Sequence, residues 1–289
     1  RGPKGGTVGT ILRDALARAR GQILGWGLSL GMLAALTVAL FDTLLAQGEG
    51  YEALVRGMPP EVLAFLGGVT DMFSPVGYLG LYFYSYMPVV AGIYAVLAGS
   101  GLVAADEEAG TLDLLLAQPI RRAALLGGRV LALALTLAAI LALTWVGFAL
   151  SAPPTGLGVG FALSAPPTGL GVGVGALALP LVSLWALLVA YGLLALLLSQ
   201  VLPSRSAAAS TAGLVLVLDY FLVSWRTIRP ELAPLARALP QGHYQGAEAL
   251  GGLDFGALSV LLGAGAVCGL LALWRFQRRD IRVAGEGGW

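Results

Sequence analysis

Four acidic residues that lie close together, Asp106, Glu107, Glu108 and Asp113, are the only cluster in this sequence with the composition of a metal-dependent active site. A prenyl- or phosphotransferase would use such carboxylates to hold Mg²⁺ against a pyrophosphate, because hard cations prefer oxygen ligands. The same residues also suit the start of a helix, whose N-terminus attracts negative charge. We interpret them as a helix start and keep an integral-membrane enzyme as an alternative.

The other reactive side chains occur singly. His243 is the only histidine and lies in a stretch bounded by proline and glycine, without a second imidazole to share a metal ion or relay a proton. Cys268 is the only cysteine, which excludes an intrachain disulfide. The only lysine, Lys4, is followed by Gly5, whereas an ATP-binding P-loop needs a lysine followed by serine or threonine. We therefore expect no catalytic residue, no metal site and no ATP site on this chain.

The composition indicates that lipid surrounds most of the chain. Hydrophobic residues make up 57% of the 289 residues and charged residues only 11%, against about 25% charged residues in a soluble domain. A transmembrane helix needs about 20 apolar residues. Six stretches are long enough, at residues 23–45, 79–102, 125–150, 177–198, 207–225 and 257–274. The sequence predicts an all-α, polytopic membrane protein with about six transmembrane helices in a single domain, residues 1–289.

The basic residues indicate how this protein is oriented. Thirteen of the 17 lysines and arginines lie before the first span, after the last, or in the connections after spans two and four, and the remaining four lie in the other connections. Positive charges near span ends resist translocation, so both termini are expected in the cytoplasm. The net charge of +1 provides no field that would attract nucleic acid, and we expect no nucleic-acid partner.

Two terminal segments are expected at the cytoplasmic surface. In residues 1–22, the apolar side chains Leu12, Leu16 and Ala19 recur at helical spacing, while arginines occupy the remaining face. This pattern predicts an amphipathic interfacial helix that lies along the membrane. Residues 275–289 are expected to form a cytoplasmic tail.

The connection between spans two and three, residues 103–124, is the most informative cytoplasmic segment. Its acidic residues are predicted to open a short helix, which Pro119 should end near Gln118. Leucines lie on both sides of this helix, which suits a position between the membrane spans and a docked protein. A connector packed only on its own bundle is the alternative.

The run EEAGTLDLLLAQPIRRAALLGGR, residues 107–129, resembles the signature segment of ABC-2 type permeases. In that family, acidic residues, Gly-Thr, a leucine-rich turn and a proline followed by a basic residue precede the third span. The family's segment belongs to the coupling region that contacts the ATPase, so the resemblance implies the same role here. The matching positions are Glu107, Glu108, Gly110, Thr111, Leu112, Leu114, Leu115, Pro119, Arg121 and Arg129.

The resemblance implies a permease subunit of an ABC transporter, an exporter in the inner (plasma) membrane of a prokaryote. It also implies separate ABC ATPase subunits that bring ATP and Mg²⁺, a second permease subunit that forms a homodimer or a heterodimer, membrane lipid as a partner, and no cofactor on this chain. The Leu, Ala, Gly and aromatic residues of the spans favour an amphipathic or lipid-like substrate. An ATP-independent membrane transporter is a further alternative, beside the membrane enzyme.

Asp219 is the clearest acidic residue within a predicted span. Intramembrane carboxylates mark substrate and ion pathways, which makes Asp219 a candidate gating residue. It also lies beside Tyr220 and close to Arg226, so reaching the interface or pairing there is the alternative.

Two other patterns concern packing and an external loop. The small-residue pairs Gly27 with Gly31 and Gly265 with Gly269 suit close helix contacts, either within one chain or between two chains. Residues 148–160 are repeated identically as residues 161–173. Because solenoid repeats are longer and more numerous, we interpret the duplication as a tolerated loop insertion.

Overall fold

The computed structural model describes residues 6–41, 57, 59, 62, 74–111, 121–151, 172–226 and 228–278. In this part of the chain every regular element is helical, and six helices are long and apolar enough to cross a membrane. They are α1 (Gly6–Ala39), α6 (Met87–Glu108), α8 (Arg122–Leu150), α9 (Ala178–Ser199), α10 (Arg205–Trp225) and α12 (Phe255–Arg278). Two short elements, α5 (Pro75–Leu79) and the π-helical turn η1 (Gly80–Tyr84), lead into α6. The predicted all-α class and the six spans are confirmed.

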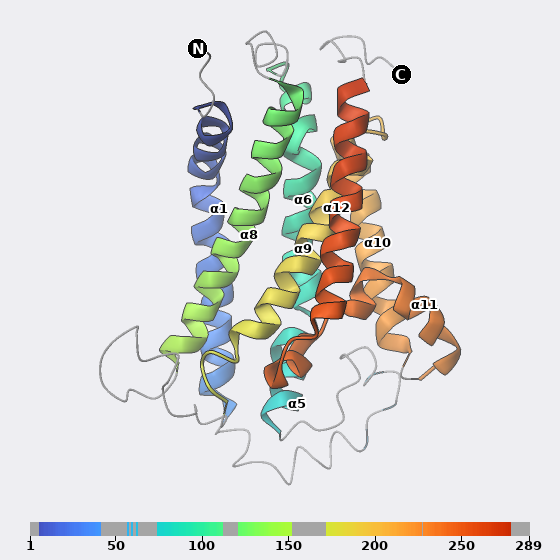
Figure 1. The fold of residues 1–289 in the computed structure, drawn as a ribbon. Coiled ribbons are helices and arrows are strands. Elements are labelled where there is room, and N and C mark those ends of the chain that lie inside the picture. The colour runs from blue at the N-terminus through green and yellow to red at the C-terminus, as the bar shows by residue number, and fades with distance from the viewer. Residues whose placement is uncertain are drawn as a thin grey trace.

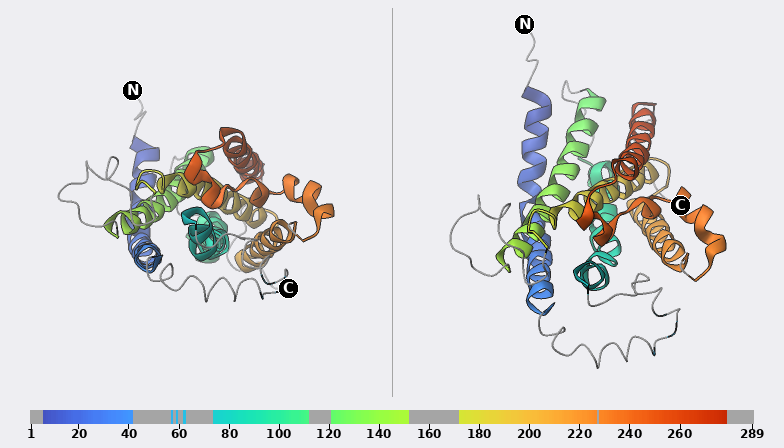
Figure 2. Two further views of the ribbon diagram at one scale, coloured as in Figure 1. Left: turned by 90° about the horizontal axis from the view of Figure 1, so that it is seen from below. Right: turned by 60° about the horizontal axis from the view of Figure 1, so that its bottom comes forward.

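The six long helices run side by side and alternate in direction, so that α1 begins and α12 ends at the same end of the bundle (Figures 1 and 2). We call this end, which carries Arg18, Arg122, Arg205 and Arg275, the basic end. The even number of spans agrees with the orientation predicted from the basic residues. That the basic end faces the cytoplasm stays a prediction.

Helix α1 is longer than a membrane crossing requires. Its 34 residues extend about 51 Å at 1.5 Å per residue, roughly 20 Å more than the hydrocarbon thickness. Residues 6–22, the described part of the predicted interfacial helix, form the first half of this helix without a break. The segment is therefore helical as expected but continuous with the first span, and its position along the membrane surface stays a prediction.

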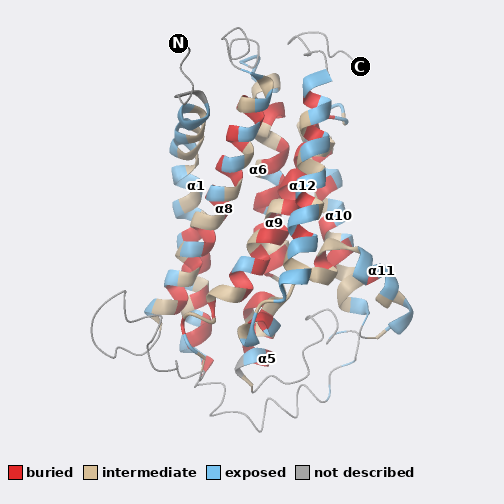
Figure 3. Cartoon of the chain, in the orientation of Figure 1, coloured by how far each residue is buried: buried red, intermediate tan, exposed pale blue. Residues whose placement is uncertain are grey.

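Helix α9 forms the centre of the bundle. Buried residues are concentrated on α9 and on the faces of α6 and α8 that turn inward (Figure 3). Leu184, Leu187 and Ala195 of α9 are fully buried. Helices α6, α8, α10 and α12 all pack against α9, whereas α1 packs mainly against α8. The bundle is thus built around α9, with α1 attached at its side through α8.

Two glycine pairs bring helices into backbone contact. A Cβ added to Gly147 of α8 would lie 2.0 Å from the carbonyl oxygen of Gly31 in α1. A Cβ added to Gly99 of α6 would lie 2.0 Å from the carbonyl oxygen of Gly192 in α9. Neither contact leaves room for a methyl group, so both depend on glycine.

The small-residue faces predicted from the sequence are used within this chain. Gly27 and Gly31 face Leu143 of α8, and Gly265 faces Ala190 of α9, whose Cα would lie 3.3 Å from an added Cβ. These contacts explain both pairs without a second chain.

Replacing Gly99 with alanine is expected to lower the free energy of unfolding by about 1–3 kcal/mol, because α6 and α9 must separate to admit the methyl group. Gly127→Ala is the matched control, since an added Cβ there meets nothing within 4 Å. Thermal unfolding of the purified protein in detergent measures both variants. Equal melting temperatures for the two would contradict the close α6–α9 contact.

The connection between α10 and α12 contains short helices. They are η2 (Pro230–Leu232), α11 (Ala233–Ala238), η3 (Pro240–His243) and η4 (Gly246–Gly251). The Tyr244 hydroxyl donates to the carbonyl oxygen of Tyr84 at 3.0 Å, and the backbone amide of Gln245 donates to Ser183 Oγ at 3.1 Å. Burial raises the pKa of the Tyr244 hydroxyl, which keeps it protonated as a donor. The connection is therefore anchored to the end of the bundle that lies opposite the basic end.

Two predictions fall wholly or largely outside the described residues. They concern the duplicated loop and the tail beyond Arg278.

Candidate functional site

The acidic residues Asp106, Glu107 and Glu108 form the last turn of α6. The prediction that they open a new helix is therefore wrong. Carboxylates at this end of a helix are unfavourable, because the helix C-terminus carries partial negative charge. Contacts made by Asp106 and Glu108 with two other helices offset this cost.

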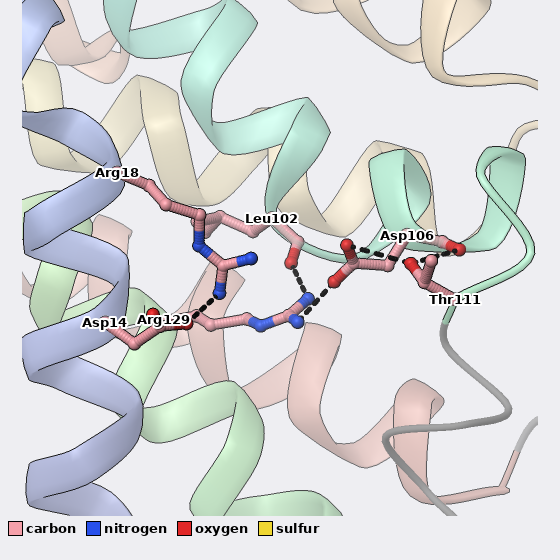
Figure 4. A network of polar contacts seen from close by, with 6 residues as sticks. All are labelled: Asp14, Arg18, Leu102, Asp106, Thr111 and Arg129. Carbon is pink, nitrogen blue, oxygen red and sulfur yellow. Dashed lines mark hydrogen bonds and ion pairs between the residues drawn. The ribbon is translucent and has the colours of Figure 1, made fainter.

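Asp106 forms an ion pair with Arg129, which reaches across from α8 (Figure 4). The Arg129 side chain is 9% exposed and that of Asp106 is 25% exposed. Arg129 also donates a hydrogen bond to the carbonyl oxygen of Leu102 in α6. One guanidinium group thus neutralises the carboxylate and joins the end of α6 to the start of α8.

Gly110 ends α6. Its φ of +66° lies in the left-handed region, which glycine adopts without the strain that a Cβ would add. The Gly110 amide donates to the carbonyl oxygen of Glu107 at 3.1 Å, and the Thr111 amide donates to that of Asp106 at 2.9 Å. These two bonds define a Schellman motif. The Gly-Thr of the signature segment is therefore a helix stop, and Thr111 adds a weak bond from Oγ1 to Asp106 Oδ1 at 3.3 Å.

Glu108 contacts the start of α10. Its Oε1 accepts a hydrogen bond from the backbone amide of Arg205 at 3.2 Å. Ser204, the N-cap of α10, accepts from the Ala207 amide at 3.1 Å. A carboxylate is favourable at a helix N-terminus, where the partial charge is positive. Glu108 thereby joins α6 to α10.

The two arginines at the start of α8 differ in their contacts. Arg121, the N-cap residue, is exposed. Arg122 donates to the carbonyl oxygen of Phe276 in α12 at 3.3 Å and lies 5.9 Å over its ring. The signature residues Leu112, Leu114, Leu115 and Pro119 lie outside the described residues.

The structure brings together at the basic end the predicted residues Glu107, Glu108, Gly110, Thr111 and Arg121. The pairing of Asp106 with Arg129 was not predicted from the sequence. The sequence feature that could have indicated it is an acidic residue, Asp106, at the end of the second span and a basic residue, Arg129, near the start of the third. The ion pair also removes Asp106 from the carboxylates available to Mg²⁺.

Asp219 lies apart from this end, inside the bundle. It is 2% exposed and accepts hydrogen bonds from the Tyr191 hydroxyl of α9 and from the backbone amide of Gln241 in η3, the latter at 3.0 Å. Arg226, the expected alternative partner, is exposed at the end of α10. Asp219 therefore joins α9, α10 and η3 instead of reaching the interface. A gating role for it stays a prediction.

Replacing Asp219 with leucine is expected to lower the free energy of unfolding by about 2–4 kcal/mol. The change leaves the Tyr191 hydroxyl and the Gln241 amide buried without an acceptor, at a cost of about 1–3 kcal/mol each. Asp219→Asn is the control, because its amide oxygen can accept both bonds. Thermal unfolding and hydrogen exchange at the Gln241 amide measure the effect, and equal stability of the two variants would contradict it.

Comparison with known proteins adds one match. The family model described as ABC-2 family transporter protein matches residues 25–281, a range that includes nearly all of the six-helix bundle. No curated protein matches the chain.

Proposed function

The chain belongs to the ABC-2 transporter family, and from this premise we propose that it is the permease subunit of an exporter driven by a separate ABC ATPase. Family membership and the six apolar helices make it a multi-pass membrane component of an ABC transporter. The finer proposal rests on one observation. The signature residues Glu107, Glu108, Gly110 and Thr111, which the structure describes, lie where α6 stops, and polar contacts join this end of α6 to α8 and α10.

In the proposed mechanism, the ATPase docks at the basic end and contacts the segment around Glu107, Gly110 and Arg121. Closure of the ATPase moves this segment, and the Asp106–Arg129 and Glu108–α10 contacts carry the movement to three spans. A partner can drive such a change only if its contacts differ between the two states. The coupling residues thus act mechanically, without bond chemistry.

The ATPase, ATP and Mg²⁺ are proposed to come from partner subunits, because this sequence lacks a P-loop. A second permease subunit, identical or different, completes the pathway in the proposed assembly. The proposed location is the inner membrane of a prokaryote, and the proposed cargo is amphipathic or lipid-like.

The test is recovery of the tagged chain from its native membrane in a gentle detergent, followed by mass spectrometry. We expect a P-loop ATPase in fixed ratio, and less of it when Glu107 and Glu108 are both replaced by lysine. Glu231→Lys is the control, since it reverses a charge in η2, near the opposite end. Recovery of intact protein without an ATPase would contradict the proposal and favour an ATP-independent transporter.

A further inference from the structure

A cavity of about 340 Å³ lies at the basic end between α1, α6, α8 and the start of α10. Its volume is within the range of small-ligand sites, about 300–1,000 Å³. None of the contacts proposed above for coupling to the ATPase requires this space, although Arg129 and Asp106 form part of its wall. The cavity therefore needs its own explanation.

The lining changes character with depth. Near the helix ends it consists of Arg18, Arg129 and Arg205 with Asp106, whereas the inner part is lined by uncharged residues, which include Leu97 and Leu133 beside Tyr94, Gln22 and Thr136. Asp106 and Tyr94 lie twelve residues apart on α6, which is about 18 Å along the helix. A charged mouth thus leads to an uncharged interior that extends toward the hydrocarbon.

The charge at the mouth is positive. Three guanidinium groups line the cavity against the single carboxylate of Asp106, which is paired with Arg129. Arg18 pairs with Asp14, but both side chains are more than 60% exposed, and such surface pairs contribute only about 0–1 kcal/mol. Arg18 is therefore free to exchange this partner for a ligand at little cost.

Arg205 is held at the mouth by the shape of α6. Its guanidinium group packs where Gly101 lacks a side chain, and a Cβ at Gly101 would lie 3.1 Å from Arg205 Nη2. Glu108 accepts a hydrogen bond from the backbone amide of Arg205 and does not line the cavity.

We propose that this cavity binds the anionic head group of a membrane amphiphile, a phosphate ester, with the start of its apolar chain in the inner part. Arginine suits this ligand because its planar fork donates two parallel hydrogen bonds to a phosphate. The head group bridges Arg18 and Arg205, and Arg129 stays paired with Asp106. The inference deepens the proposed function by naming a ligand class, and it rests on that function only for placing the cavity at membrane depth.

The experiment is native mass spectrometry of the purified full chain, given equal amounts of phosphatidylglycerol and phosphatidylcholine with identical acyl chains. We expect one phosphatidylglycerol to be retained about tenfold better. The variant Arg18→Gln with Arg205→Gln is expected to lose this preference. Arg13→Gln is the matched control, because Arg13 is exposed on the same helix and does not line the cavity.

Equal retention of the two lipids by the unaltered chain would overturn the proposal, as would an equal loss in the Arg13→Gln control. Glycerol 3-phosphate forms the third arm. If it binds as tightly as the lipid, the site takes a free phosphate compound and the assignment to an amphiphile is overturned. No ATPase is present in the lipid-retention experiment, so a negative result there leaves the transporter assignment intact. Likewise, failure to recover an ATPase from the native membrane leaves the lipid-retention result intact.

Discussion

Replacing Arg129 with glutamine is expected to lower the free energy of unfolding by about 3 kcal/mol, the largest effect predicted for one residue at the basic end. Breaking a buried ion pair by removing one partner costs about 3–5 kcal/mol. The lower value applies because Asp106 is 25% exposed, so water solvates part of the remaining charge. Denaturant or thermal unfolding in detergent measures the loss.

Two further variants separate the ion pair from a general loss of charge. Arg121→Gln removes an exposed arginine from the same helix start and should change the stability by less than about 0.5 kcal/mol. Replacing Asp106 with leucine and Arg129 with methionine together should restore most of the stability, because no unpaired charge remains. Equal stability of the Arg129→Gln and Arg121→Gln proteins would disprove the structural role of the pair.

Replacing Gly110 with valine is expected to reduce the recovered ATPase about tenfold while the six helices stay folded. A residue with a Cβ adopts the left-handed conformation at a cost of about 1–2 kcal/mol, and a β-branched residue is the least tolerated. A tenfold change corresponds to about 1.4 kcal/mol, so the strain is sufficient to redirect the chain at Thr111. The molar ratio of ATPase to permease measures docking, and circular dichroism measures helix content.

Gly110→Asn provides the control, since asparagine is among the residues that tolerate positive φ. It should keep most of the bound ATPase although it also adds a side chain at this exposed position. Equal recovery with valine and asparagine would show that the conformation of Gly110 does not matter for docking.

The spans were predictable because hydropathy is a local property of the sequence. The stretch 177–198 corresponds to α9 at Ala178–Ser199, and the stretch 207–225 corresponds to α10 at Arg205–Trp225. Both helices are apolar over the length that hydrocarbon demands. The fold class and the count of six therefore follow from composition and length alone.

The end of α6 was not predictable in this way. The hydropathy pattern predicts that the second span ends at residue 102 and that a new helix begins with the acidic residues, whereas α6 continues to Glu108. The helix tolerates these acids at its C-terminus because Arg129 and the start of α10 lie nearby. Arg205 is 97 residues from Glu108, and a propensity argument cannot detect such a distant contact.

Asp219 shows the same limit. The sequence offered Tyr220 and Arg226 as neighbours, yet its partners are Tyr191 and Gln241, 28 and 22 residues away. The short helices around Gln241 have no hydrophobic periodicity long enough to be recognised, so their return toward α10 depends on tertiary contacts.

The glycine contacts also determine how this bundle can deform. Gly31 with Gly147 locks α1 to α8, and Gly99 with Gly192 locks α6 to α9, since backbones this close cannot slide without a clash. We therefore expect α1 and α8 to move as one rigid unit and α6 and α9 as another, with the easiest movement at the interface between the two units. A shear of about 1–2 Å along this interface, typical of helix shifts in switching proteins, would widen or narrow the space between α1 and α6 while each pair of helices stays intact.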